Sequence, residues 1–87
     1  ELMDNLRQNI NDIDNQILSL LQNRNKISQK IGEYKKNNNL PVYDSVRETQ
    51  LLDRLGKLNM KSDLKLEENF IKEIWSLIMN NSKKLQE

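Results

Sequence analysis

The 87-residue sequence contains no cysteine and no histidine. Their absence excludes disulfide bonds, thiol nucleophiles, serine-histidine-aspartate triads and most zinc sites. We therefore expect neither a metal ion nor a cofactor, and any chemistry at this chain must be carried out by other side chains.

The chain also has few aromatic residues, almost no net charge and no long hydrophobic run. No apolar run approaches the ~20 residues of a membrane span, and the N-terminal region lacks the apolar stretch of a secretion signal. The chain has 14 basic and 13 acidic residues, a net charge of +1 and 5% aromatic residues, so it offers little to phosphate backbones or to stacked bases. We expect a single cytoplasmic domain, residues 1–87, without a membrane or nucleic-acid partner.

A regular apolar pattern covers the first part of the chain. From Leu6 to Tyr34 the apolar residues alternate steps of four and three, and Gly32 is the only interruption by glycine or proline. This pattern predicts a helix from about Asp4 to Lys36. Such a helix is on the order of 50 Å long, whereas a compact domain of this size is about 30 Å across. We therefore expect the helix to extend beyond its own domain and to pack against a second copy of the chain.

The turn-forming residues after this helix predict a turn and then a second helix. Asparagines at 37–39 favour a turn, and Pro41 disfavours helical angles in the residue before it. Asp44 or Ser45 is expected to cap the second helix, and Ser45 with Glu48 has the spacing of a capping box.

The third helix is expected to follow a loss of apolar periodicity between residues 56 and 60. Ser62 or Asp63 would cap it. Its expected inward side chains are Leu66, Phe70, Ile74, Leu77, Ile78 and Leu85. The sequence thus predicts an all-α fold of three helices in the order long, short, long.

Two cations interrupt the apolar face of the first helix. Position 24, where the pattern requires an apolar residue, holds Arg24, and Lys35 follows eleven residues later. At about 100° per residue, eleven steps return to nearly the same direction, so both cations face one region. Arg24 alone would be interpreted as a residue that fixes the register or the oligomeric state of packed helices, or as one whose guanidinium reaches water. Together the two cations predict an anion-binding site, because buried charge without a partner is costly.

The other two helices add polar residues to the same set. Arg47 lies in the first turn of the second helix, beside Asp44 and Glu48, although the start of a helix favours negative charge. In the third helix the apolar stripe continues as Ser82 and Gln86, which alone is typical of a solvated helix end.

In this order and spacing, the residues resemble the all-helical chorismate mutase family, type II. The matching segments are Leu6-Arg7 with Ile10 and Ile13-Asp14, Leu20 to Arg24, Ile31 to Lys35, Pro41 to Asp44 with Arg47-Glu48, and Ile78 with Ser82 and Gln86. They cover essentially the whole chain.

The resemblance implies an enzyme that converts chorismate to prephenate, on the route to phenylalanine and tyrosine, as an intertwined helical homodimer with two sites. It implies that Arg7 and Arg24 bind the two carboxylates of the substrate, with Arg7 donated by the partner chain. The spacing agrees, because 17 residues of helix separate the two arginines by about 25 Å and by roughly 100° in direction. One chain cannot place both on the same small dianion.

The remaining roles are likewise implied by the resemblance. Lys35 and Gln86 would hydrogen-bond the ether oxygen of the breaking bond, Glu48 and the Asp44 region would hold the ring hydroxyl, Ser82 would support a carboxylate, and Arg47 would assist the anionic groups.

Two alternatives stay open at the level of sequence. Related helical dimers eliminate pyruvate from isochorismate in a similar cationic pocket, so lyase activity is one. The other is a non-catalytic dimerisation or regulatory module of a larger aromatic-biosynthesis enzyme. Such a module would be expected to lose its unpaired cations, whereas all eight polar residues are present here.

Overall fold

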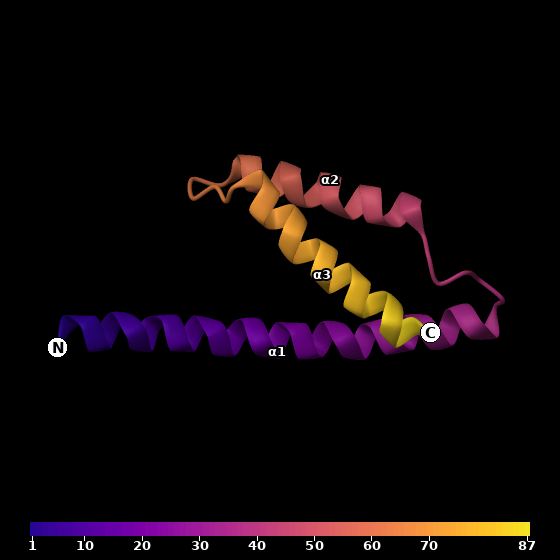
Figure 1. Ribbon diagram of the computed structural model, residues 1–87, viewed down its shortest axis with the longest axis horizontal. Helices are drawn as coiled ribbons and strands as arrows, with labels where there is room; N and C mark the ends of the chain where they lie inside the picture. The colour runs from indigo at the N-terminus through magenta and orange to yellow at the C-terminus, as the bar shows by residue number, and fades with distance from the viewer.

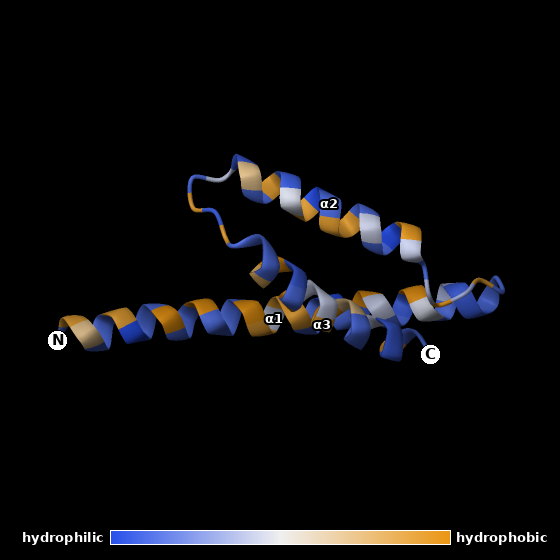
Figure 2. Ribbon diagram, turned by 45° about the horizontal axis from the view of Figure 1, so that its top comes forward, coloured by the Kyte–Doolittle hydropathy of each residue, from blue (hydrophilic) through white to orange (hydrophobic).

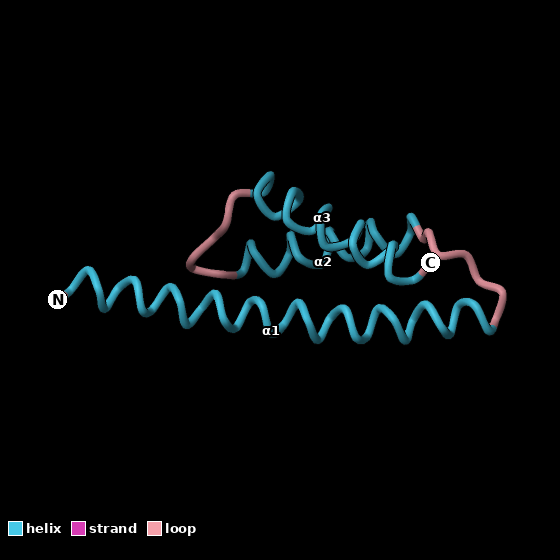
Figure 3. Tube along the Cα trace, turned by 60° about the horizontal axis from the view of Figure 1, so that its bottom comes forward, coloured by secondary structure: helices cyan, strands magenta, loops and turns pink.

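The computed structural model contains three α-helices and no strand, which confirms the all-α prediction (Figures 1 and 3). They are α1 (Leu2–Asn37), α2 (Ser45–Lys61) and α3 (Glu68–Gln86). The predicted order of lengths holds only loosely, because α3 has 19 residues and α2 has 17. None of the helices is both long and apolar enough to cross a membrane.

The long helix α1 sets the shape of the molecule. Its 36 residues run without a break, and the longest dimension of the chain is 56 Å. The helix ends in the asparagine turn, where Asn39 has a positive φ of 55°. Asparagine tolerates this left-handed conformation better than most residues, so the predicted turn lies at the predicted place.

The start of α2 confirms Asp44, one of the two predicted caps, and contradicts the predicted capping box. Asp44 is the N-cap, and its carboxylate accepts a hydrogen bond from the backbone N–H of Arg47 at 3.0 Å. Ser45 is already the first helical residue, so its pairing with Glu48 as a capping box was wrong.

The predicted boundary between the second and third helices was also wrong. Helix α2 continues through residues 56–60 to Lys61, and Ser62 is its C-cap. The amide side chain of Asn59 binds both the N–H and the C=O of Leu66, each at 2.8 Å, and so fixes the connection as a loop. Leu66 therefore precedes α3 and is 52% exposed, instead of packing inward from the third helix.

Helix α3 joins the other two helices. It packs against α1 and against α2, whereas α1 and α2 do not pack on each other. In Figure 1, α3 runs obliquely from the end of α2 to the C-terminal half of α1. At the crossing, a Cβ built on Gly32 would lie 2.7 Å from the Cα of Gln86. The glycine therefore allows the end of α3 to approach α1.

Little of the chain is buried. Six of 87 residues are buried, and Leu51, Ile71 and Met79 are the large apolar ones. The N-terminal half of α1 extends beyond α2 and α3 and carries a hydrophobic stripe (Figure 2). Its apolar residues Leu6, Ile10, Ile13 and Ile17 are 49–57% exposed. This stripe has no partner within the chain.

Candidate active site

A pocket of about 440 Å³ lies where α1 and α2 stand apart and α3 bridges them. Residues from all three helices and from the loop before α2 line it. They are Arg24, Ile27, Ser28, Ile31, Lys35, Val42, Asp44, Arg47, Glu48, Leu51, Met79, Ser82, Lys83 and Gln86. Seven of the eight site residues predicted from the sequence are in this set, and Arg7 is not.

Helix α1 contributes one face to the pocket. Arg24, Ser28, Ile31 and Lys35 are spaced by four, three and four residues, so their side chains lie along one side of the helix. The expectation that Arg24 and Lys35 face the same region is confirmed.

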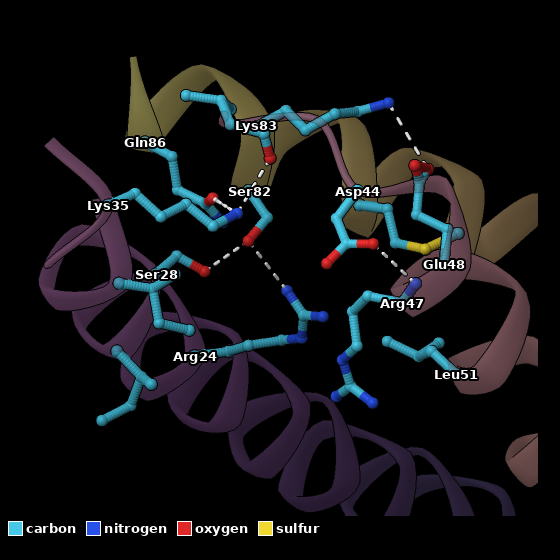
Figure 4. A pocket seen from close by; sticks show the side chains of 14 residues that line it. Arg24, Ser28, Lys35, Asp44, Arg47, Glu48, Leu51, Ser82, Lys83 and Gln86 are labelled. Atoms are coloured by element: carbon cyan, nitrogen blue, oxygen red, sulfur yellow. Dashed lines mark hydrogen bonds and ion pairs between the residues drawn. The ribbon is translucent and has the colours of Figure 1, made fainter. Parts of the chain in front are cut away.

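A chain of hydroxyl groups links Arg24 to α3. The Arg24 guanidinium donates to the hydroxyl oxygen of Ser82 at 3.3 Å, and the hydroxyls of Ser82 and Ser28 are hydrogen-bonded to each other (Figure 4). Ser28 is 3% exposed and Ser82 is 8% exposed. These contacts orient the Arg24 head without neutralising its charge.

Lys35 joins the end of α3 to the loop before α2. Its ammonium donates to the side-chain oxygen of Gln86 at 2.7 Å and to the backbone carbonyl of Val42 at 2.8 Å. Both acceptors are neutral, so the full positive charge remains. Because Gln86 uses its oxygen toward Lys35, its NH₂ group keeps its donors for a ligand.

Two guanidinium groups share one side of the pocket. Arg24 and Arg47 point toward each other in Figure 4, and neither forms a salt bridge with a carboxylate. Burial lowers the pKa of Arg24, and the positive charge of Arg47 lowers it further. Four cations and two carboxylates line the pocket, which leaves an excess of two positive charges. The arrangement favours a small anion, above all one with two negative charges.

The two carboxylates have different surroundings. Asp44 is engaged as the cap of α2, whereas Glu48 receives only the ammonium of Lys83, at 3.4 Å. The other Glu48 oxygen, Oε2, is buried and has no hydrogen-bond partner. No group of three or more carboxylates that could hold a metal ion occurs in the molecule.

Arg7 lies on the exposed N-terminal half of α1, away from the pocket residues of its own chain. As the helix spacing predicts, Arg7 and Arg24 of one chain do not line the same pocket.

Sequence reasoning missed three residues that shape the site: Ser28, Lys83 and Gly32. Ser28 lies four residues after Arg24, on the same face, and that spacing is a usable signal. Lys83 resembles any surface lysine near a helix end, and only the packing of α2 on α3 brings it to Glu48. Gly32 interrupts the helical pattern, and nothing in the sequence indicates that it contacts the end of α3.

The sequence model of type II chorismate mutases matches residues 6–87, nearly the whole chain. The chain belongs to the type II chorismate mutase family. It is similar to the chorismate mutase of Methanocaldococcus jannaschii, with 31% identity over 86 residues, which are 99% of this chain and 85% of that protein.

The chain is also similar to part of a longer protein and to a solved structure. The bifunctional chorismate mutase/prephenate dehydratase of Buchnera aphidicola subsp. Schizaphis graminum is 40% identical over 76 residues, which are 87% of this chain and 19% of that protein. A solved structure, described as a conserved hypothetical protein from Pyrococcus furiosus, has 38% sequence identity and a TM-score of 0.79. The match covers 100% of this chain and 97% of that one.

Proposed function

We propose that this chain is an isomerase that converts chorismate to prephenate, a step toward phenylalanine and tyrosine. The observation that carries the proposal is the pocket with unpaired Arg24 and Arg47 and with Lys35 bound only to neutral oxygens. Chorismate is a small dianion, and the excess of two positive charges complements it. The pocket volume of about 440 Å³ lies within the range of small-molecule sites.

The arginines would bind the carboxylates of the substrate. Guanidinium groups suit planar carboxylates because they donate two parallel hydrogen bonds. Arg24 is held by Ser82, which leaves its remaining donors for a substrate carboxylate, and Arg47 adds positive charge from α2. Glu48 and the region of Asp44, the residue that caps α2, would hold the ring hydroxyl, with Glu48 accepting its hydrogen bond.

Lys35 and Gln86 would act on the ether oxygen. In the rearrangement one C–O bond breaks and one C–C bond forms within the same molecule, so no nucleophile or proton transfer is needed. Negative charge accumulates on the ether oxygen as its bond stretches. The ammonium of Lys35, which donates to the side-chain oxygen of Gln86 at 2.7 Å, and the NH₂ of Gln86 can both donate to that oxygen of the substrate. The walls of the pocket would select the compact conformer in which the reacting carbons approach.

A second copy of the chain would complete the site. The apolar stripe on the N-terminal half of α1 is unpaired, and burial of such a stripe against another helix stabilises it. In a two-fold dimer with antiparallel α1 helices, Arg7 of one chain would lie beside Arg24 of the other. The cationic pocket of each chain would then gain one further guanidinium.

The direct test is to follow the loss of chorismate absorbance and to identify the product. We expect prephenate, with no pyruvate. Pyruvate formed from isochorismate would instead support the lyase, and a folded dimer that converts neither compound would support a non-catalytic module.

A further inference from the structure

The carboxylate of Glu48 has unused capacity to accept hydrogen bonds. An ionised carboxylate has about four acceptor positions. Here Oε1 receives one long contact of 3.4 Å from Lys83, and Oε2 is buried without a partner. A buried acceptor without a donor costs free energy, so its presence in a binding pocket indicates that a ligand group serves it.

Lys83 is the one group that holds this carboxylate in place. It extends from α3 and reaches Glu48 on α2, while its ammonium also lies 5.0 Å from the centre of the Tyr43 ring in the preceding loop. The side chains of Lys83 and Glu48 are 30% and 26% exposed, so the pair is better shielded from water than the other two salt bridges of the chain. Three separate segments of the chain therefore meet at one ammonium group.

We infer that Lys83 is a positioning residue, which orients the ionised carboxylate of Glu48 so that this carboxylate receives the hydroxyl of the substrate. The inference rests on the proposed function. Lys83 does not itself bind a substrate carboxylate, because its ammonium is already shared between Glu48 and the face of the Tyr43 ring. An interaction with the ring hydroxyl is the same in the ground state and in the transition state, so its loss should raise KM more than it lowers kcat.

The test is a double-mutant cycle of Lys83→Met and Glu48→Gln, assayed with chorismate. In the wild-type background, Lys83→Met should lower kcat/KM roughly three- to tenfold, mainly through KM. In the Glu48→Gln background the same change should have less than about a twofold effect, because Lys83 acts through Glu48. Lys83→Arg keeps a cation that can pair with Glu48 and lie over the Tyr43 ring, and it should restore most of the loss.

Lys84→Met is the matched control, since Lys84 is the exposed neighbour and its side chain forms no hydrogen bond or salt bridge. It removes the same charge and should leave kcat and KM as in the wild type. Circular dichroism of each variant would check that it is folded. Equal losses from Lys83→Met in both backgrounds would overturn the inference and make Lys83 a direct substrate ligand. A Lys83→Met variant with unchanged KM would also overturn it. A wild-type protein that forms no prephenate would contradict the proposed function itself, and this inference with it.

Discussion

Gly32 is predicted to be required for activity and not for stability. It faces the last residue of α3, and the Cβ of an alanine at this position would lie 2.7 Å from the Cα of Gln86 and 3.0 Å from its carbonyl oxygen. Ordinary van der Waals contact begins at 3.4 Å, so the two helices must separate by about 0.7 Å. The obstacle is backbone, which cannot rotate away as a flexible side chain can.

This separation acts on the bond between Lys35 and Gln86. Their distance of 2.7 Å would increase to as much as about 3.4 Å, near the limit of a hydrogen bond. Hydrogen bonds to charged groups contribute about 1.5–3 kcal/mol, and each ~1.4 kcal/mol corresponds to a factor of ten in rate. Gly32→Ala should therefore lower kcat/KM roughly ten- to a hundredfold.

The stability of the folded chain should change little. Alanine is about 1 kcal/mol more favourable than glycine inside a helix, which offsets part of the cost of the clash. The chain provides a matched control in Gly56, its other glycine, whose added Cβ would meet nothing within 4 Å. Gly56→Ala should raise the melting temperature by about 4–8 °C, without changing the rate at which chorismate is consumed.

Both variants are assayed for prephenate formation and for thermal unfolding. A Gly32→Ala protein with wild-type kcat/KM would refute the reasoning, because the end of α3 would then tolerate displacement. A loss of activity in Gly56→Ala of the same size would show that alanine in a helix, rather than the contact with Gln86, is responsible.

Three further predictions concern the charges of the pocket. Arg24→Met should reduce kcat/KM ten- to a hundredfold or more, while the melting temperature holds or rises. The lowered pKa of Arg24 means that the unfolded chain binds this proton more tightly than the folded chain, so at neutral pH the charge costs stability. Gln86→Glu should be nearly inactive at pH 7.5 and recover toward pH 5, because the new carboxyl donates to the ether oxygen only when it is protonated, and an ionised carboxylate would repel the charge that builds there. Mixing Arg7→Ala chains with Arg24→Met chains should restore activity, because one of the two sites in each heterodimer then carries neither defect.

A different experimental outcome would contradict each of these three predictions. A less stable Arg24→Met protein with normal activity would make Arg24 structural. If the pH profile of Gln86→Glu matches that of the wild type, Gln86 lies outside the site. If subunit exchange is confirmed by mass spectrometry and mixing restores nothing, Arg7 is not shared between chains.

The helices and much of the pocket could be predicted from the sequence because periodicity carries directional information. Arg24 was visible as a cation in an apolar series, and Lys35 as a second cation in the same direction, and both line the pocket. Helical geometry alone relates these two positions, so no knowledge of the tertiary packing was needed.

The start of α3 could not be predicted because the sequence around residue 62 suits two local structures, a helix start at Ser62 and a loop held by Asn59. The hydroxyl of Ser62 accepts a hydrogen bond from the N–H of Leu64 at 3.1 Å, which imitates the start of a helix. Asn59 meanwhile binds the backbone of Leu66 and holds the following residues in a loop. Similarly, the pairing of Lys83 with Glu48 depends on how α2 packs on α3, and the sequence contains no signal for it.

The small interior of the single chain has a consequence for folding. With six of 87 residues buried and half of α1 lacking a partner, one chain has little apolar surface with which to offset the loss of conformational entropy. In the proposed dimer most of that burial occurs between chains, so folding and association become one equilibrium that is second order in chain concentration. The unfolding midpoint would rise with protein concentration, and dilution alone would unfold the chain and dismantle both pockets together.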